Sequence, residues 1–111
     1  MKEELLDNAK EFLEAAEDNL TKSRFNVAVS DFLKAITGFC DYLIYKDMKI
    51  IIKNHNERFE ILKKYYQKIY LKIFNLFKKY RDSYVLKLNK NDALTLKEYA
   101  YELKRTTENK K

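Results

Sequence analysis

The stretch from Ile61 to Arg81 contains seven lysine or arginine residues and no acidic residue. If this stretch is helical, at about 100° per residue, four of its lysines fall on one strip; they are Lys64, Lys68, Lys72 and Lys79. Like charges four residues apart destabilise a helix by about 0.2–0.5 kcal/mol per pair, so the strip indicates a counter-charge. That counter-charge is either an anionic ligand such as RNA, or the acidic stripe of the first helix, Glu4, Asp7, Glu11 and Glu14. We favour pairing with the acidic stripe, inside the bundle or across a dimer, and therefore expect weak or absent RNA binding.

Residues suited to acid–base or metal chemistry are few. His55 is the only histidine and Cys40 the only cysteine. Di-iron bundles need Glu-x-x-His motifs, but Ile52 stands three residues before His55, so we expect no metal and no cofactor. Cys40 lies among apolar neighbours and has no second cysteine to pair with, which indicates a core position. We interpret His55 as a solvated residue at the start of a helix.

Composition predicts one all-α domain over residues 1–111. The chain has no proline and one glycine, and these two residue types most often interrupt helices. The 46% hydrophobic content is too high for disorder, the 36% charged content is too high for a membrane protein, and no apolar run approaches the roughly 18 residues that span a bilayer. The acidic start of the chain lacks the apolar stretch of a secretory signal, so we expect a cytoplasmic protein.

Charge is distributed unevenly along the chain. Residues 1–48 carry 6 Lys/Arg against 10 Asp/Glu, whereas residues 49–111 carry 17 against 7. A basic half indicates an anionic partner such as RNA, DNA or an acidic protein. The alternative is a lysine-rich, AT-biased genome that fills solvated faces with lysine.

Apolar residues at three- and four-residue steps predict four helices, at about residues 2–22, 24–46, 54–84 and 91–105. The second is the most apolar and should be buried against several neighbours or against another subunit, with Gly38 marking a close contact between helices. The third has an apolar stripe of Phe59, Leu62, Tyr66, Ile69, Ile73, Leu76 and Tyr80. Because this stripe is needed by the bundle, we expect no membrane-surface role for that helix. Short connections predict an up-and-down antiparallel four-helix bundle.

The sequence also predicts the helix caps, the connections between the helices and the state of the C-terminal tail. Ser23 is the expected N-cap of the second helix, and Asn54 or Asn56 that of the third. Residues 47–53 form either an extended link or a frayed continuation, residues 85–90 form a loop, and Asn91 with Asp92 starts the fourth helix. The polar tail 106–111 should fray. Tyr66, Tyr80 and Tyr84 are expected in the core.

The segment Ala28-Val29-Ser30-Asp31-Phe32-Leu33-Lys34-Ala35 resembles the second helix of HEPN domains, a family of small helical nucleotide-binding proteins. As in those domains, the first helix is rich in Ala and Glu, and a loop histidine, in Asn54-His55-Asn56, opens the third helix. The resemblance spans about residues 9–105 and implies a HEPN-like bundle that forms dimers. Many HEPN relatives are non-catalytic partners of small nucleotidyltransferases. The resemblance thus implies a toxin–antitoxin-like protein that binds a nucleotidyltransferase, a nucleotide or RNA.

Active HEPN members are ribonucleases whose signature is an arginine, a polar residue, a few others and then a histidine. Arg81 and Asp82 match its start, but Leu86 stands at the histidine position. Without that imidazole no group is evident that would move a proton, so we expect no enzymatic activity. The alternative is a residual ribonuclease in which His55 substitutes, and Arg81 and His55 join the strip lysines as candidate ligand-binding residues.

A different class of function is a helical protein-interaction module. Ala28-x-x-x-Phe32-x-x-Ala35 also resembles the second helix of a tetratricopeptide hairpin. That motif recurs every 34 residues, but positions 62, 66 and 69 hold Leu, Tyr and Ile. The second resemblance therefore implies helix-pair packing without an array.

The second helix also predicts a homodimer. It carries more apolar surface, at Tyr42, Ile44 and Tyr45, than three neighbouring helices would cover. Closed two-fold symmetry is the commonest way to bury such a surface.

Overall fold

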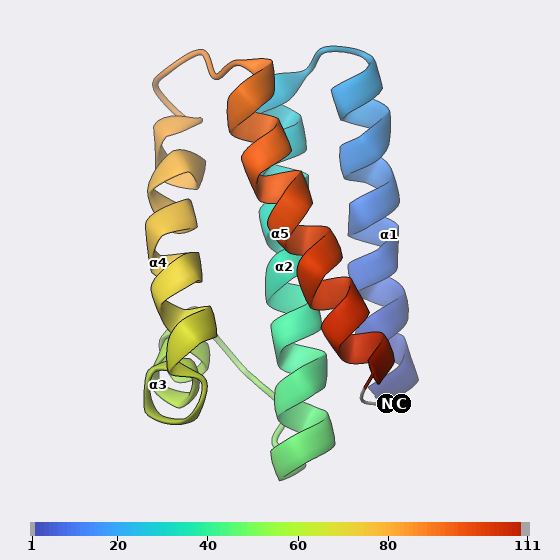
Figure 1. The fold of residues 1–111 in the computed structure, drawn as a ribbon, viewed down its shortest axis with the longest axis vertical. Helices are drawn as coiled ribbons and strands as arrows, with labels where there is room; N and C mark the ends of the chain where they lie inside the picture. The colour runs from blue at the N-terminus through green and yellow to red at the C-terminus, as the bar shows by residue number, and fades with distance from the viewer. Residues whose placement is uncertain (1, 110–111) are drawn as a thin grey trace.

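A computed structural model describes residues 2–109 of the chain, whose regular secondary structure is entirely helical. The helices are α1 (Lys2–Thr21), α2 (Phe25–Met48), α3 (His55–Tyr65), α4 (Gln67–Asp82) and α5 (Lys90–Asn109). The four long helices lie along the long axis with alternating directions, and the short α3 lies across one end (Figure 1). The all-α bundle is thus confirmed.

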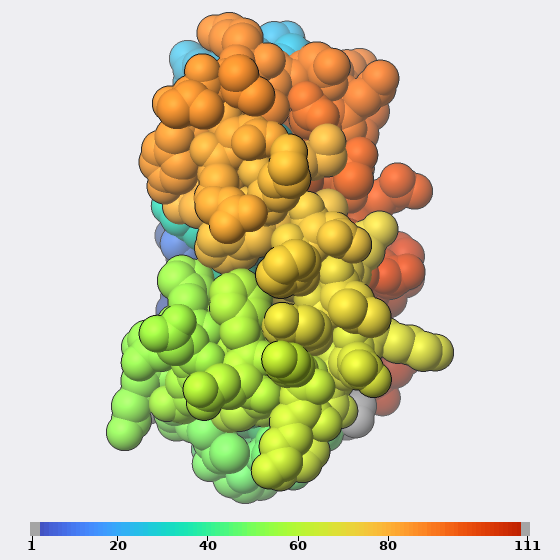
Figure 2. All heavy atoms as spheres, turned by 90° about the vertical axis from the view of Figure 1, so that its left-hand side faces the viewer, coloured from blue at the N-terminus to red at the C-terminus, as the bar shows by residue number. Residues whose placement is uncertain are grey.

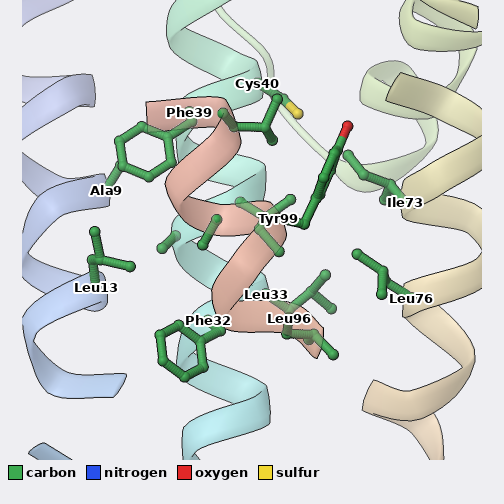
Figure 3. Close-up of a cluster of buried hydrophobic side chains, with 14 of the residues drawn as sticks. Ala9, Leu13, Phe32, Leu33, Phe39, Cys40, Ile73, Leu76, Leu96 and Tyr99 are labelled. Atoms are coloured by element: carbon green, nitrogen blue, oxygen red, sulfur yellow. The ribbon is translucent and has the colours of Figure 1, made fainter. Parts of the chain in front are cut away.

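Helix α2 is the central element of the bundle. It contacts α1, α4 and α5, and α1 and α4 lie on opposite sides of the α2–α5 pair (Figure 1). Phe32 and Phe39 of α2 face α1, while Leu96 of α5 and Leu76 of α4 approach α2 from its other sides (Figure 3). This placement confirms that the most apolar helix is buried against several neighbours, as its wide apolar face predicts.

Gly38 lies where α2 approaches α1 most closely. A Cβ atom built on Gly38 would stand 2.8 Å from the Cβ of Ala9 and 3.2 Å from its Cα. Real side chains do not reach such distances, so the predicted close contact at this glycine is confirmed.

The predicted four-helix count is wrong for the described residues, because the expected helix 54–84 is two helices. Tyr66 has φ −135° and ψ 57°, outside the helical region, although its N–H still donates to the carbonyl of Leu62 at 2.8 Å. Its hydroxyl donates to Asp47 Oδ2 at 2.6 Å, which ties the break to the end of α2. A tertiary contact therefore competes successfully with helical continuation at this residue.

Several predicted details at the helix ends are corrected. Ser23 is not an N-cap: it has φ 59°, and Arg24 holds the cap position without a side-chain bond. The link after α2 is non-helical, since Lys49 with φ 60° ends that helix. Asn54 caps α3 as predicted, accepting from the N–H of Glu57.

The last helix starts earlier and ends later than predicted. Asn89 and Asp92 form a reciprocal cap, each side chain accepting from the other's backbone N–H at 2.9–3.0 Å, so α5 begins at Lys90. The tail does not fray as predicted: α5 continues to Asn109, and Thr107 is fully buried. Residues 110–111 of that predicted tail lie outside the described residues.

None of the described helices combines the length and the apolar character that a membrane-spanning helix requires.

Candidate functional site

The break at Tyr66 folds α3 against α4 and gathers aromatic side chains from both. The rings of Phe59 and Phe77 are 5.5 Å apart and those of Phe59 and Tyr70 are 6.4 Å apart. In an unbroken helix residues 59 and 77 would be about 27 Å apart, at 1.5 Å per residue. Figure 2 shows α3 and α4 together on one face of the molecule. The break therefore creates a cluster that a straight helix would lack.

The aromatic contacts continue along α4 as a ladder of neighbouring rings. We define the aromatic ladder as Phe59, Tyr70, Phe74, Phe77, Tyr80 and Tyr84, in which neighbouring rings are 5.4–6.4 Å apart. Phe74 is 61% exposed. A hollow of about 220 Å³ is lined by four of these rings and by Arg81. The face thus offers open ring surfaces beside a guanidinium group.

The expected core placement of three tyrosines is wrong in part. Tyr66 and Tyr80 are half-buried, but Tyr84 is 72% exposed. The hydroxyls of Tyr80 and Tyr84 share a hydrogen bond of 2.6 Å, and this bond raises the pKa of Tyr80. Tyr84 lies beyond the end of α4, where the buried stripe has already ended.

His55 is held by an ion pair between α2 and α3. Arg58 donates from Nε and Nη2 to the two carboxylate oxygens of Asp41 at 2.6 and 2.7 Å, and both side chains are less than 15% exposed. Arg58 Nη1 also contacts His55 Nδ1. Because a guanidinium can only donate, Nδ1 must accept, and the proton of the neutral imidazole must sit on Nε2. Burial, and then the charge of Arg58, lower the pKa of His55.

This tautomer determines what His55 can do chemically. Its Nε2–H is a donor, and its only lone pair is occupied by Arg58. A general base needs a free lone pair directed at the substrate. The arrangement suits hydrogen bonding to an anion and does not suit proton abstraction.

The residues of the degraded ribonuclease motif have different surroundings. Phe77 lines both the hollow that holds Arg81 and a smaller one, of about 80 Å³, that holds His55. Leu86 lies instead in the connection between α4 and α5, with its side chain 56% exposed. The carboxylate of Asp82 forms an ion pair with Lys78, with 3.5 Å between Asp82 Oδ2 and Lys78 Nζ. Phe77 thus lies between the hollows of Arg81 and His55, whereas Leu86 lines neither hollow, although its N–H donates to the carbonyl of Asp82 at 2.7 Å.

The four strip lysines have different surroundings. The break at Tyr66 leaves Lys64 on α3, over the ring of Tyr65, and the other three on α4. Lys72 lies over the ring of Tyr99 of α5, at 5.8 Å, and Lys79 pairs with Asp92 of α5 at 2.8 Å. This pair lowers the pKa of Asp92. Lys68 is exposed and forms no ion pair within residues 2–109.

The expected pairing of the strip with the acidic stripe of the first helix is wrong within one chain. Helices α1 and α4 lie on opposite sides of the bundle (Figure 1). Glu17 of α1 pairs across the bundle instead with α5: it binds Lys97 at 3.1 Å and accepts from the Tyr101 hydroxyl at 2.7 Å. Within residues 2–109, Lys64, Lys68 and Lys72 of the strip therefore form no ion pair with α1.

Three features of this face were missed in the sequence. Phe74 and Leu71 lie off the apolar stripe of α4, and this offset in a basic helix was a usable sign of exposure. The contact of Phe59 with Phe77 had no comparable sign, because it depends on the break at Tyr66, and the choice of Arg58 as the partner of Asp41 depends on how α3 packs on α2.

Among the described residues no group of three or more His, Cys, Asp or Glu side chains is arranged to hold a metal ion. Comparisons of the chain with models of protein families, with curated proteins and with solved structures gave no match.

Proposed function

We propose that this protein is a non-catalytic, HEPN-like helical domain that binds single-stranded RNA on its α3–α4 face. The observation that carries the proposal is the hollow lined by four aromatic rings and Arg81, in which Phe74 is exposed and the rings of Phe59, Tyr70 and Phe77 are half-buried. Proteins that bind single strands combine such stacking platforms with cationic residues that follow the phosphates. The resemblance of the sequence to HEPN domains supports the same class of ligand.

The basic residues of α3 and α4 support an external anion. Lys63, Lys68 and Arg81 form no ion pair within residues 2–109, and no acidic residue interrupts the sequence from Ile61 to Arg81. Like charges on one helix oppose folding unless a counter-charge is present. An RNA backbone would supply that charge.

Equilibrium binding of a fluorescent single-stranded RNA tests the proposal. Phe74→Ala should weaken binding about 5- to 150-fold, since one stacked base contributes roughly 1–3 kcal/mol. Leu71→Ala is the matched control: it is 55% exposed against 61% for Phe74, lies on the same helix, and has no ring. Equal loss in the two variants would contradict base stacking.

Salt dependence tests the phosphate contacts separately. Replacing Lys68 and Arg81 by Gln should lower the log–log salt slope by about 1.4, at roughly 0.7 per contact with a single strand. A control that removes two charges from the α1 side, Lys10→Gln with Lys22→Gln, should leave the slope unaltered. Binding of adenosine monophosphate as tight as that of RNA would reassign the hollow to a free nucleotide.

The homodimer and the nucleotidyltransferase partner stay predictions of the sequence. The reason given for the dimer does not hold, because Tyr42 and Ile44 are each 1% exposed in the single chain. Helix α2 is central, so its wide apolar face is covered by α1, α4 and α5.

A further inference from the structure

The connection between α4 and α5 presents three consecutive apolar or aromatic side chains to solvent. Tyr84, Val85 and Leu86 are 72%, 82% and 56% exposed. The connection lies at the same end of the bundle as the link between α1 and α2 (Figure 1), and its atoms form the upper part of the face in Figure 2. We call residues 84–86 the apolar tip. Adjacent large apolar side chains at this exposure indicate an interaction site.

The exposure of the apolar tip is built into the backbone. Asn26 of α2 donates from Nδ2 to the carbonyls of Ser83 and Leu86, both at 2.8 Å, and its Oδ1 accepts from the N–H of Leu88 at 2.8 Å. The N–H of Leu86 also donates to the carbonyl of Asp82 at 2.7 Å. One side chain thus fixes both ends of the segment, and the tip cannot turn inward without breaking these bonds.

The surroundings of the tip are positively charged. The acidic residues in the adjoining helix turns are already paired: Asp18 with Lys22, Asp82 with Lys78, and Asp92 with Lys79. Helix α2 has no acidic residue in its first turn. Three cations near this end form no ion pair within residues 2–109; they are Arg24, Lys87 and Lys90. The occupant of this surface should therefore be both apolar and anionic.

We infer that this end of the bundle docks on an anionic phospholipid membrane, with the apolar tip entering the interface and the cations meeting the headgroups. A stable protein–protein interface uses about 20–30 residues on each side, many more than the tip offers. A membrane accepts an apolar tip without a complementary pocket, and tyrosine is a preferred residue at its interface. Lysine and arginine near an anionic leaflet each strengthen attachment. The contact is peripheral and departs from the expectation that the predicted helix ending at Tyr84 has no membrane-surface role. It does not depend on the RNA-binding proposal.

Co-flotation of the full chain with lipid vesicles tests the inference. Vesicles of three parts phosphatidylcholine to one part phosphatidylserine should bind the protein, and vesicles of phosphatidylcholine alone should bind it much more weakly. Leu86→Asp should lower the partition coefficient at least tenfold, because a charge cannot enter the apolar interface. Leu71→Asp is the matched control, since Leu71 is 55% exposed on α4 and lies outside the tip. Lys87→Gln with Lys90→Gln should weaken binding about fivefold per cation removed.

Two further measurements decide the remaining alternatives. Asn26→Ala removes the bonds that fix the tip and should weaken vesicle binding while the helical circular dichroism is retained. Equal binding to both vesicle types, or equal loss in Leu86→Asp and Leu71→Asp, would overturn the inference. So would a dimer in sedimentation equilibrium that Leu86→Asp abolishes, because a second copy would then cover the tip.

Discussion

A double-mutant cycle on Gly38 of α2 and Ala9 of α1, which are in contact, should separate the effect of steric fit on stability from the effect of helix propensity. In Gly38→Ala, propensity stabilises α2 by about 1 kcal/mol. The new Cβ would stand 2.8 Å from the Cβ of Ala9, which is buried between two backbones that cannot move independently. Overpacking of this kind costs about 1–3 kcal/mol and usually more than the propensity gain. We therefore expect a net loss of about 0–2 kcal/mol in the free energy of unfolding.

The single variant Ala9→Gly and the double variant Ala9→Gly with Gly38→Ala complete the double-mutant cycle. Ala9→Gly loses about 1 kcal/mol of propensity and about 0.8 kcal/mol from one buried methyl group, so it should lose about 2 kcal/mol. In the exchange Ala9→Gly with Gly38→Ala, both effects cancel, because the methyl group only moves to the facing helix. Its nearest remaining atom would be the Cα of residue 9, at 3.2 Å. The double variant should therefore lie within about 1 kcal/mol of the wild type, with a coupling energy of about 2–3 kcal/mol.

Urea unfolding followed by circular dichroism measures the free energy of unfolding of the wild type, the two single variants and the double variant. A loss of 1 kcal/mol should also lower the melting temperature by roughly 4 °C or more in a domain of this size. Additive losses in the double variant would refute the reasoning, since they would mean that the two residues do not share one steric contact. A stabilised Gly38→Ala would likewise mean that α1 moves away at little cost.

Three further outcomes are expected from the α3–α4 side. Asp41→Ala should lower the free energy of unfolding by about 3 kcal/mol, because it leaves the guanidinium of Arg58 buried and unpaired, and urea unfolding measures this loss. The pKa of His55 is lowered from 6.5 in the folded chain, so the unfolded chain binds the proton first; stability should fall as the pH drops through about 6.5, and His55→Gln should not show this fall. The purified protein should not cleave RNA, since His55 has no free lone pair and Leu86 no imidazole; metal-independent cleavage abolished by Arg81→Ala would contradict this expectation.

The apolar periodicity was enough to predict the long helices and their buried faces. The stripe from Phe59 to Tyr80 is half-buried or buried throughout, even though the helix that carries it is broken. The break itself could not be predicted, because Tyr66 lies on the stripe and no glycine or proline marks it. The Tyr66 hydroxyl donates to Asp47 across 19 positions of the chain, and this tertiary contact accompanies the break. Local patterns carry no information about such a contact.

The partners of the polar residues that support the candidate surfaces could not be predicted from the sequence either. Asn26 looks like any polar residue in the first turn of a helix, yet it makes three hydrogen bonds to a segment about 60 positions away. Asp41 stands in the most apolar helix, where an unpaired carboxylate would be costly. That burial should have indicated a cationic partner, but it could not indicate Arg58.

The placement of charge discriminates between the two explanations of the basic half. If lysine merely filled solvated surface, exposed positions on every helix of that half would be basic with acidic residues among them. Helix α5 has this mixed character, with Glu98, Glu102 and Glu108 beside its lysines. From Gln67 to Arg81, by contrast, α4 has no acidic residue, and it also exposes Phe74 and Leu71. General lysine enrichment alone does not account for the missing carboxylates or for the exposed ring, whereas both features fit the surface for bases and phosphates that we propose.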